Sequence, residues 1–329
     1  MNIWKLFLVC TLVMTHSSWT MANERPIMKI SDQGEAQLWY QLDSFDPAMD
    51  FLGYQKDRPA KSAKLDSVRT NKYGFSYTPF ELVNLSYVYG QTKTHVTRYT
   101  EPMSVDTRTS YQAARIQTAL YRNESWLIGA EVGWNKHSSP ENNVYKYDFG
   151  NIQVSWPGHV LVTSSSEDSG YLGAIRMRYE NGSWAFHYGY EQRQIDVKAS
   201  MTSESETVNS KLAAQAPQSE PWKEKHHIQQ LGFDYTFLTN FTFSVDYQNF
   251  TIKRMDDYIP RKNKKDFNNN ETLDIYAFWK MDKSITPYIH AKLSRHSTLG
   301  DDPSAYNQRT NHKFENPLGL LSLGLHIKF

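Results

Sequence analysis

Apolar and polar residues alternate with a period of two over most of this chain. In its last segment, apolar residues occupy every second position: Leu321, Leu323, Leu325, Ile327 and Phe329. Successive side chains of a β-strand point to opposite faces, so this spacing predicts a strand with one apolar and one polar face. The same pattern recurs upstream in segments 126–134, 184–190, 231–237, 241–247 and 273–281.

Segments of this kind predict about twelve strands: near 35–44, 67–78, 83–98, 110–122, 125–136, 169–180, 183–198, 226–237, 241–253, 271–282, 286–296 and 318–329. Short and long connections alternate between them. The short ones lie at 79–81, 123–124, 181–182, 238–240 and 283–285, and long polar segments lie near 45–66, 100–109, 138–167, 200–224, 255–270 and 298–315. Asn181-Gly182 predicts a type I′ hairpin turn, which needs a positive φ at both central residues. The composition of 200–224 predicts a mobile surface loop. Within 138–167, residues 144–162 are expected to extend the neighbouring strands beyond a membrane.

An even number of strands with alternating short and long connections is the plan of an outer-membrane β-barrel. We therefore predict an all-β fold, a closed antiparallel transmembrane barrel with short periplasmic turns and long extracellular loops. Aromatic residues flank the short turns: Tyr77, Phe80, Tyr121, Trp126, Tyr179, Trp184, Phe237, Phe241 and Phe329. Amphipathic rings prefer the headgroup boundary, so this position predicts the periplasmic aromatic girdle. A soluble β-sandwich has no reason to ring one end with aromatics.

The first 22 residues have the layout of a secretory signal peptide. Lys5 precedes the apolar run 6–14, and Ala22 offers a small residue for cleavage, which leaves 23–329 as the barrel domain. Cys10, the single cysteine, lies in the removed segment.

Elsewhere no apolar run approaches the length of a membrane-spanning helix. Lys and Arg total 36 against 35 for Asp and Glu, which disfavours a nucleic-acid partner.

The signal peptide, the strand count and the Phe-terminated last strand together resemble a twelve-stranded outer-membrane barrel of Gram-negative bacteria. In layout the chain is most similar to a solitary autotransporter-type β-domain. The resemblance implies that the barrel assembly machinery reads an assembly signal in the last strand: Leu321, Leu323, Leu325, Ile327 and Phe329. Only Asn23–Gly34 precede the first strand, which is short for a passenger or a pore-filling helix, so secretion of a passenger is not implied.

The strand phase predicts a set of charged and histidine side chains that line the lumen: Glu131, Arg176, Arg178, Glu191, Arg193, Asp234, Asp246, Asp274, Lys280, His290, Lys292 and His326. They could form a polar channel for a small polar solute. They could equally close the lumen by pairing as internal salt bridges. Neither sign dominates, which argues against a strongly ion-selective pore.

One pair of residues raises the alternative of an outer-membrane lipid hydrolase, of phospholipase or lipid A deacylase type. His137 and Ser139 form a His-x-Ser pair with Asn142 and Asn143 close behind. Outer-membrane phospholipases use a His-x-Ser-Asn arrangement, in which His takes the serine proton. Here Pro140 follows the serine, and the strand phase sends both side chains toward the lumen. His296-Ser297 is a weaker pair of the same kind.

The remaining features do not point to a cofactor or a metal. Arg261, Lys262, Lys264 and Lys265 could contact lipopolysaccharide phosphates from a loop. Adjacent His226 and His227 point to opposite faces of a strand, which disfavours shared metal binding.

The sequence thus favours a barrel in the outer membrane, surrounded by lipids and lipopolysaccharide. It would act as a passive pore or a translocator-like barrel without passenger, and the alternatives are a lipid hydrolase and a structural or adhesive barrel with a plugged lumen.

Overall fold

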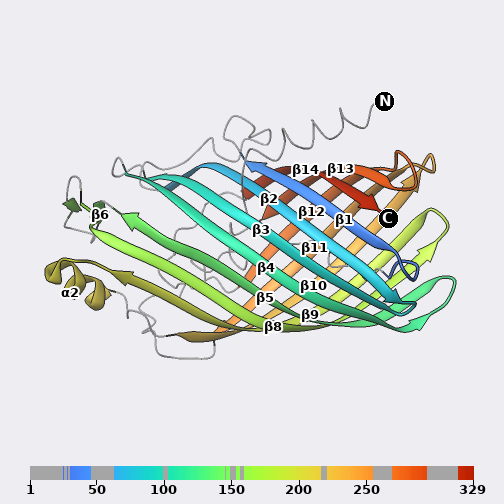
Figure 1. Cartoon of the computed structure of the whole chain (residues 1–329), viewed down its shortest axis with the longest axis horizontal. Coiled ribbons are helices and arrows are strands. Elements are labelled where there is room, and N and C mark those ends of the chain that lie inside the picture. Colours follow the sequence, from blue (N-terminus) through green and yellow to red (C-terminus); the bar gives the residue numbers. More distant parts are fainter. Residues whose placement is uncertain are drawn as a thin grey trace.

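The computed structural model describes Arg25, Met28 and residues 30–45, 63–98, 103–144, 146–148, 153–155, 159–215, 221–254, 269–294 and 318–329. Twelve strands form one closed barrel in the order β1-β14-β13-β12-β11-β10-β9-β8-β5-β4-β3-β2 (Figure 1). They are β1 (Ala36–Phe45), β2 (Ala63–Phe80), β3 (Val83–Arg98), β4 (Met103–Arg122), β5 (Trp126–Val144), β8 (Val162–Asn181), β9 (Trp184–Thr202), β10 (Trp222–Phe237), β11 (Phe241–Arg254), β12 (Asn269–Trp279), β13 (Ile285–Ser294) and β14 (Leu318–Lys328). All neighbours pair antiparallel, and β14 pairs with β1 to close the ring. The predicted closed, twelve-stranded antiparallel barrel is confirmed.

Two strand boundaries differ from the sequence-based prediction. The expected long connection 100–109 is wrong, because β4 begins at Met103 and pairs with β3 down to the Arg98–Met103 pair. Strands β5 and β8 pair from Trp126–Tyr179 out to Val144–Val162, so residues 137–144 and 162–168 extend them, and the expected extension by residues 144–162 is wrong. A small two-stranded sheet of β6 (Lys146–Asp148) and β7 (Gln153–Ser155) lies in the same connection.

The segment 200–224, predicted to be a mobile surface loop, contains a helix that the sequence analysis does not predict. Residues Glu206–Gln215 form helix α2, which lies at the loop end of the barrel (Figure 1). Ser205 caps this helix, because its hydroxyl oxygen accepts a hydrogen bond from the Val208 N–H at 3.5 Å. The segment contains Leu, Lys, Gln and two Ala, which favour a helix. Among the described residues, no helix is long and apolar enough to cross a membrane.

Tight turns connect the strands at the opposite end. Asn181 pairs with Trp184, so Gly182 and Ser183 are the central residues of this turn. Gly182 has a φ of 60°, but Ser183 is not among the described residues with positive φ, so the expected type I′ turn is wrong. Glycine at the first central position fits a type II′ turn. Two positive φ values occur instead at Leu238 (52°) and Thr239 (55°), between β10 and β11.

The barrel is apolar outside and polar inside. On β14, Leu323 is 59% exposed whereas its neighbour Ser322, which points inward, is 1% exposed. Large hydrophobic side chains are exposed on the outer face of most other strands, while the buried side chains of the lumen are mainly polar or charged. Aromatic residues next to the turns pack against one another, as in the tilted pair Trp126–Tyr179 at 4.8 Å and the stacked pair Phe237–Phe241 at 5.7 Å between ring centroids. This reversed polarity places candidate functional groups in the lumen.

Candidate functional site

Most of the predicted lumen residues are buried inside the barrel. The buried ones are Glu131, Arg176, Glu191, Arg193, Asp234, Asp246, Asp274, His290 and Lys292. The Arg178 side chain retains 18% exposure. Lys280 and His326 line a cavity at the turn end. Of the predicted assembly-signal residues, Leu321, Leu323 and Phe329 are exposed, and Leu325 and Ile327 are half-buried.

One ion-pair network follows the lumen wall across β4, β5, β8 and β9. Arg176 contacts Glu131 at 2.7 Å through Nε and Glu191 at 2.6 Å through Nη2. Arg115 adds a second contact to Glu131 at 2.9 Å, and Arg193 pairs with Glu191. Each buried carboxylate therefore meets two guanidinium groups, which compensates the cost of burying its charge.

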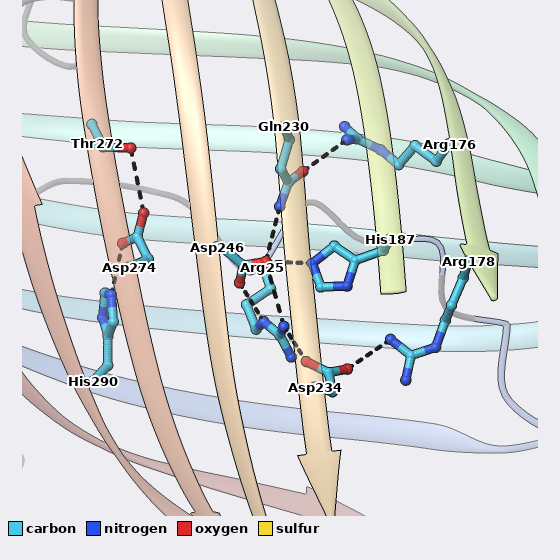
Figure 2. Close-up of polar contacts among 10 residues, drawn as sticks. All are labelled: Arg25, Arg176, Arg178, His187, Gln230, Asp234, Asp246, Thr272, Asp274 and His290. Atoms are coloured by element: carbon cyan, nitrogen blue, oxygen red, sulfur yellow. Dashed lines mark hydrogen bonds and ion pairs between the residues drawn. The ribbon is translucent and has the colours of Figure 1, made fainter. Parts of the chain in front are cut away.

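A second network lies nearer the turn end and includes a residue from outside the barrel strands (Figure 2). Arg25 contacts Asp234 of β10 at 2.5 Å and Asp246 of β11 at 2.7 Å. Arg178 of β8 contacts the other Asp234 oxygen at 2.9 Å, and His187 of β9 is hydrogen-bonded to Asp246. From inside the lumen, Arg25 thus bridges one aspartate on β10 and one on the adjacent strand β11.

Described residues of the N-terminal segment contact opposite sides of the lumen wall. Met28 is fully buried and packs in a cluster with Ile30 and Ala119 of β4, against Leu127 of β5. Strands β4 and β11 lie five positions apart in the ring of twelve, so they face each other almost directly. The described residues of this segment are not helical, yet they reach the lumen. Arg25, Met28 and Ile30 therefore occupy part of the lumen.

The charge of Arg25 is stabilised where it lies. Burial alone would lower the pKa of this guanidinium, but the carboxylates of Asp246 and Asp234 outweigh burial and raise the pKa above its ordinary value. Its guanidinium carbon also lies 5.3 Å from the ring centroid of Tyr276 and 5.8 Å from that of Phe278. Two ion pairs and two aromatic rings therefore hold one cation.

A cavity of about 760 Å³ adjoins this cluster on the turn side of the barrel. Arg25, Asp234, Tyr276 and Phe278 contribute to its wall. Sequence reasoning missed Arg25, because residues 23–34 have no strand periodicity that would assign them to the lumen. It also omitted Arg115, although this residue lies in phase with other inward-facing positions of β4.

Four buried histidines of the lumen each contact a carboxylate. His137 lies 2.7 Å from Asp168, His226 2.9 Å from Glu224 and His290 2.8 Å from Asp274, and His187 pairs with Asp246. His290 also stacks on Tyr276, with ring centroids 4.1 Å apart. Each pair gives a buried carboxylate of the lumen wall a histidine as its partner.

The geometry of His137 and Ser139 bears on the hydrolase alternative. Both side chains are buried, and His137 is hydrogen-bonded to Asp168 through Nδ1. The Ser139 hydroxyl donates to the Arg108 carbonyl at 3.2 Å. The side chains of Asn142 and Asn143 lie outside the described residues. A hydrolase that takes lipid from the bilayer would need this pair on the outer face.

Several other sequence predictions cannot be compared with the structure. The signal peptide, the basic run 261–265 and His296-Ser297 lie outside the described residues.

His226 and His227 point to opposite faces of β10. His226 is buried beside Glu224, whereas His227 contacts the Tyr190 hydroxyl at 3.0 Å from the outer face. Within the described part of the chain, no group of three or more His, Cys, Asp or Glu is arranged to hold a metal ion.

Comparison with solved structures identifies the same architecture. The chain is similar to the translocator domain of the autotransporter NalP from Neisseria meningitidis, with a TM-score of 0.56 and 6% identity over 91% of this chain and 90% of that one. It also aligns with the KdgM porin (TM-score 0.43, 11% identity, 89% and 99% covered) and with an outer membrane channel from Pseudomonas putida F1 (TM-score 0.46, 9% identity, 94% and 100% covered). No family model and no curated protein matches the sequence. At such identities the likeness to NalP defines the fold alone: a twelve-stranded barrel of the outer-membrane type.

Proposed function

We propose that this protein is an integral outer-membrane β-barrel that works as a solute channel, closed at rest by its N-terminal segment. The exposed apolar outer face and the aromatic belt near the turns support insertion in a bilayer. A lumen wall of polar and charged side chains supports passage of a polar solute. Orientation with the turns in the periplasm follows from the general plan of such barrels.

The observation that carries the proposal is the path of the N-terminal segment. Met28 packs against β4 and β5, and Arg25 binds two carboxylates on β10 and β11, so these residues contact opposite sides of the lumen and line a cavity of about 760 Å³. The wall networks that involve Arg176 connect adjacent strands and do not need the segment. Withdrawal of residues 25–30 would therefore leave the barrel wall intact while it opens the lumen.

Conductance in planar bilayers tests this function. The wild-type protein should conduct poorly, and a variant without residues 23–30 should conduct more. A second variant, Asp234→Asn with Asp246→Asn, should also conduct more because it removes the anchors of Arg25. Slower migration on a denaturing gel after boiling confirms that each variant is folded, since closed barrels resist detergent.

Two outcomes would favour the alternatives. Folded variants that conduct no better than wild type would support a structural or adhesive barrel with a plugged lumen. Hydrolysis of phospholipid vesicles that Ser139→Ala abolishes would support a lipid hydrolase.

A further inference from the structure

The groups around the Arg25 guanidinium form a binding site that is distinct from the rest of the wall. We call Asp234, Asp246, Tyr276 and Phe278 the guanidinium site. The two carboxylates contact Nη2 and Nε of Arg25, and the two rings lie within 6 Å of its guanidinium carbon. Figure 2 shows Asp234 and Asp246 on their strands beside Arg25, and Tyr276 and Phe278 belong to strand β12. All four residues are therefore part of the barrel wall and stay in place when Arg25 leaves.

Arg25 is the one guanidinium that contacts Asp246 among the described residues. Without Arg25, Asp234 keeps its contact with Arg178 at 2.9 Å. Asp246 is 1% exposed and, among the described residues, would keep its contacts with His187 and with the amide of Gln230 at 3.5 Å. A buried carboxylate without a compensating cation is strongly unfavourable. An open channel therefore leaves a site that attracts a replacement cation.

Unused hydrogen-bonding groups lie beside the carboxylates. Ser244 faces the lumen between the two acidic positions, paired in register with Asp234 and two residues before Asp246 on β11. It is fully buried, and its hydroxyl has no hydrogen-bond partner among the described residues. The Nδ1 atom of His187 is likewise without a partner there. Buried polar atoms of this kind are rare unless a ligand or water completes them.

The aromatic rings decide which cation fits. A guanidinium is planar, weakly hydrated, and able to bind carboxylates while it lies on an aromatic face, whereas an ammonium or a metal ion is a compact, strongly hydrated charge. The turn-side cavity also carries Arg122, Lys280 and Lys283 against Glu124 and Glu180. This rim offers no long-range attraction for bare cations, so recognition depends on the short-range geometry of the guanidinium site.

We propose that the guanidinium site binds a small guanidinium solute, and that Arg25 is a tethered occupant that the solute replaces. The binding site stands on the described geometry, and its role in transport rests on the proposed channel function. A solute with a guanidinium group would bind Asp234 and Asp246 through its N–H groups and lie against Tyr276 and Phe278. Release of Arg25 and binding of the solute would then be mutually exclusive.

Calorimetric titration of the detergent-solubilised protein tests the site without any need for conductance. Ethylguanidinium, propylammonium and Na⁺ are titrated into wild type, Arg25→Ala and Arg25→Ala with Asp246→Asn. Arg25→Ala should bind ethylguanidinium at least tenfold more tightly than wild type, where Arg25 competes. It should bind propylammonium at least tenfold more weakly than ethylguanidinium, and the double variant should lose binding. Boiled and unboiled samples are compared on a gel to confirm that each variant is folded.

The outcomes separate this proposal from the channel function. Equal affinity of wild type and Arg25→Ala, equal affinity for both organic cations, or binding that survives Asp246→Asn would each overturn the guanidinium site. If Arg25→Ala folds and binds ethylguanidinium but no variant conducts, the site stands and the channel function fails. If the deletion variant conducts and Arg25→Ala binds nothing, the channel stands and the site fails.

Discussion

Phe329 and Ala36 exchange backbone hydrogen bonds across the closing seam of the barrel. The Phe329 N–H donates to the Ala36 carbonyl at 2.9 Å, and the Ala36 N–H donates to the Phe329 carbonyl at 3.4 Å. An ion pair between Lys328 and Glu35 lies beside them. The phenyl ring is 69% exposed on the outer face, next to the turns. Phe329 thus joins the first and last strands by its backbone and faces the bilayer with its side chain.

Phe329→Ser should sharply lower the amount of assembled barrel in the outer membrane. Loss of an interfacial aromatic removes about 1.5–3 kcal/mol of apolar burial at most, which a closed barrel can tolerate. Assembly is less tolerant, because the last strand must pair with β1, and we propose that the assembly machinery reads this strand. Quantification of heat-modifiable protein in isolated outer membranes measures the effect.

Leu320→Ala is the matched control for that prediction. Leu320 lies on the same strand but faces the lumen and is 6% exposed. Its truncation also deletes apolar atoms, yet it leaves the outward apolar face of β14 unchanged. Near-normal and equal levels of both variants would contradict an assembly signal in the last strand.

Single cysteines should report the orientation of the barrel, because the predicted mature chain has none of its own. Ser183 is exposed in the turn between β8 and β9, and Ser210 is exposed on α2 at the opposite end. A membrane-impermeant maleimide added to intact cells should label Ser210→Cys and not Ser183→Cys. Permeabilisation of the outer membrane should make both reactive. Labelling of Ser183→Cys on intact cells would invert the topology.

Thr239→Gly should stabilise the barrel modestly. Thr239 has a φ of 55°, a conformation that β-branched residues adopt only with strain. Glycine adopts it freely, although it adds entropy to the unfolded chain. We expect a net gain of about 0.5–1 kcal/mol, measured by urea unfolding of the refolded protein in detergent. Thr236→Gly, in the regular part of β10, should destabilise instead, and a similar loss for Thr239→Gly would show that the turn is not strained.

The sequence predicts the barrel well because a membrane demands a regular pattern. Lipid on one side and a polar lumen on the other force strict alternation, as in Leu321–Phe329. The alternation of apolar and polar residues is lost where the strands extend beyond the apolar band of the membrane. Residues 106–110 of β4 and 138–143 of β5 contain no large apolar side chain apart from Pro140, so no alternation marks them as strand, and only pairing with neighbouring strands assigns them.

The site could be predicted only as a list of inward-facing groups. Phase places Asp234 and Asp246 in the lumen, but their pairing depends on the register between β10 and β11, which a single sequence does not reveal. Arg25 could not be found at all, because the contact joins residues more than 200 positions apart in the chain. Tyr276 and Phe278 were recognised as strand residues, but their role as rings beside a cation depends on Arg25.

Gly232→Ala should disturb the guanidinium site without preventing the barrel from folding. A methyl group at Gly232 would overlap Nε2 of His187 and Oδ1 of Asp246, so the imidazole and the carboxylate must move apart. Asp246 would then hold Arg25 less well, and the N-terminal segment would leave the lumen more often. The variant should remain heat-modifiable, while its bilayer conductance should rise above that of wild type. Gly173→Ala is the matched control, because a methyl group there meets no atom within 4 Å. Unchanged conductance in a folded Gly232→Ala barrel would mean that the Asp246 contact does not hold the lumen closed.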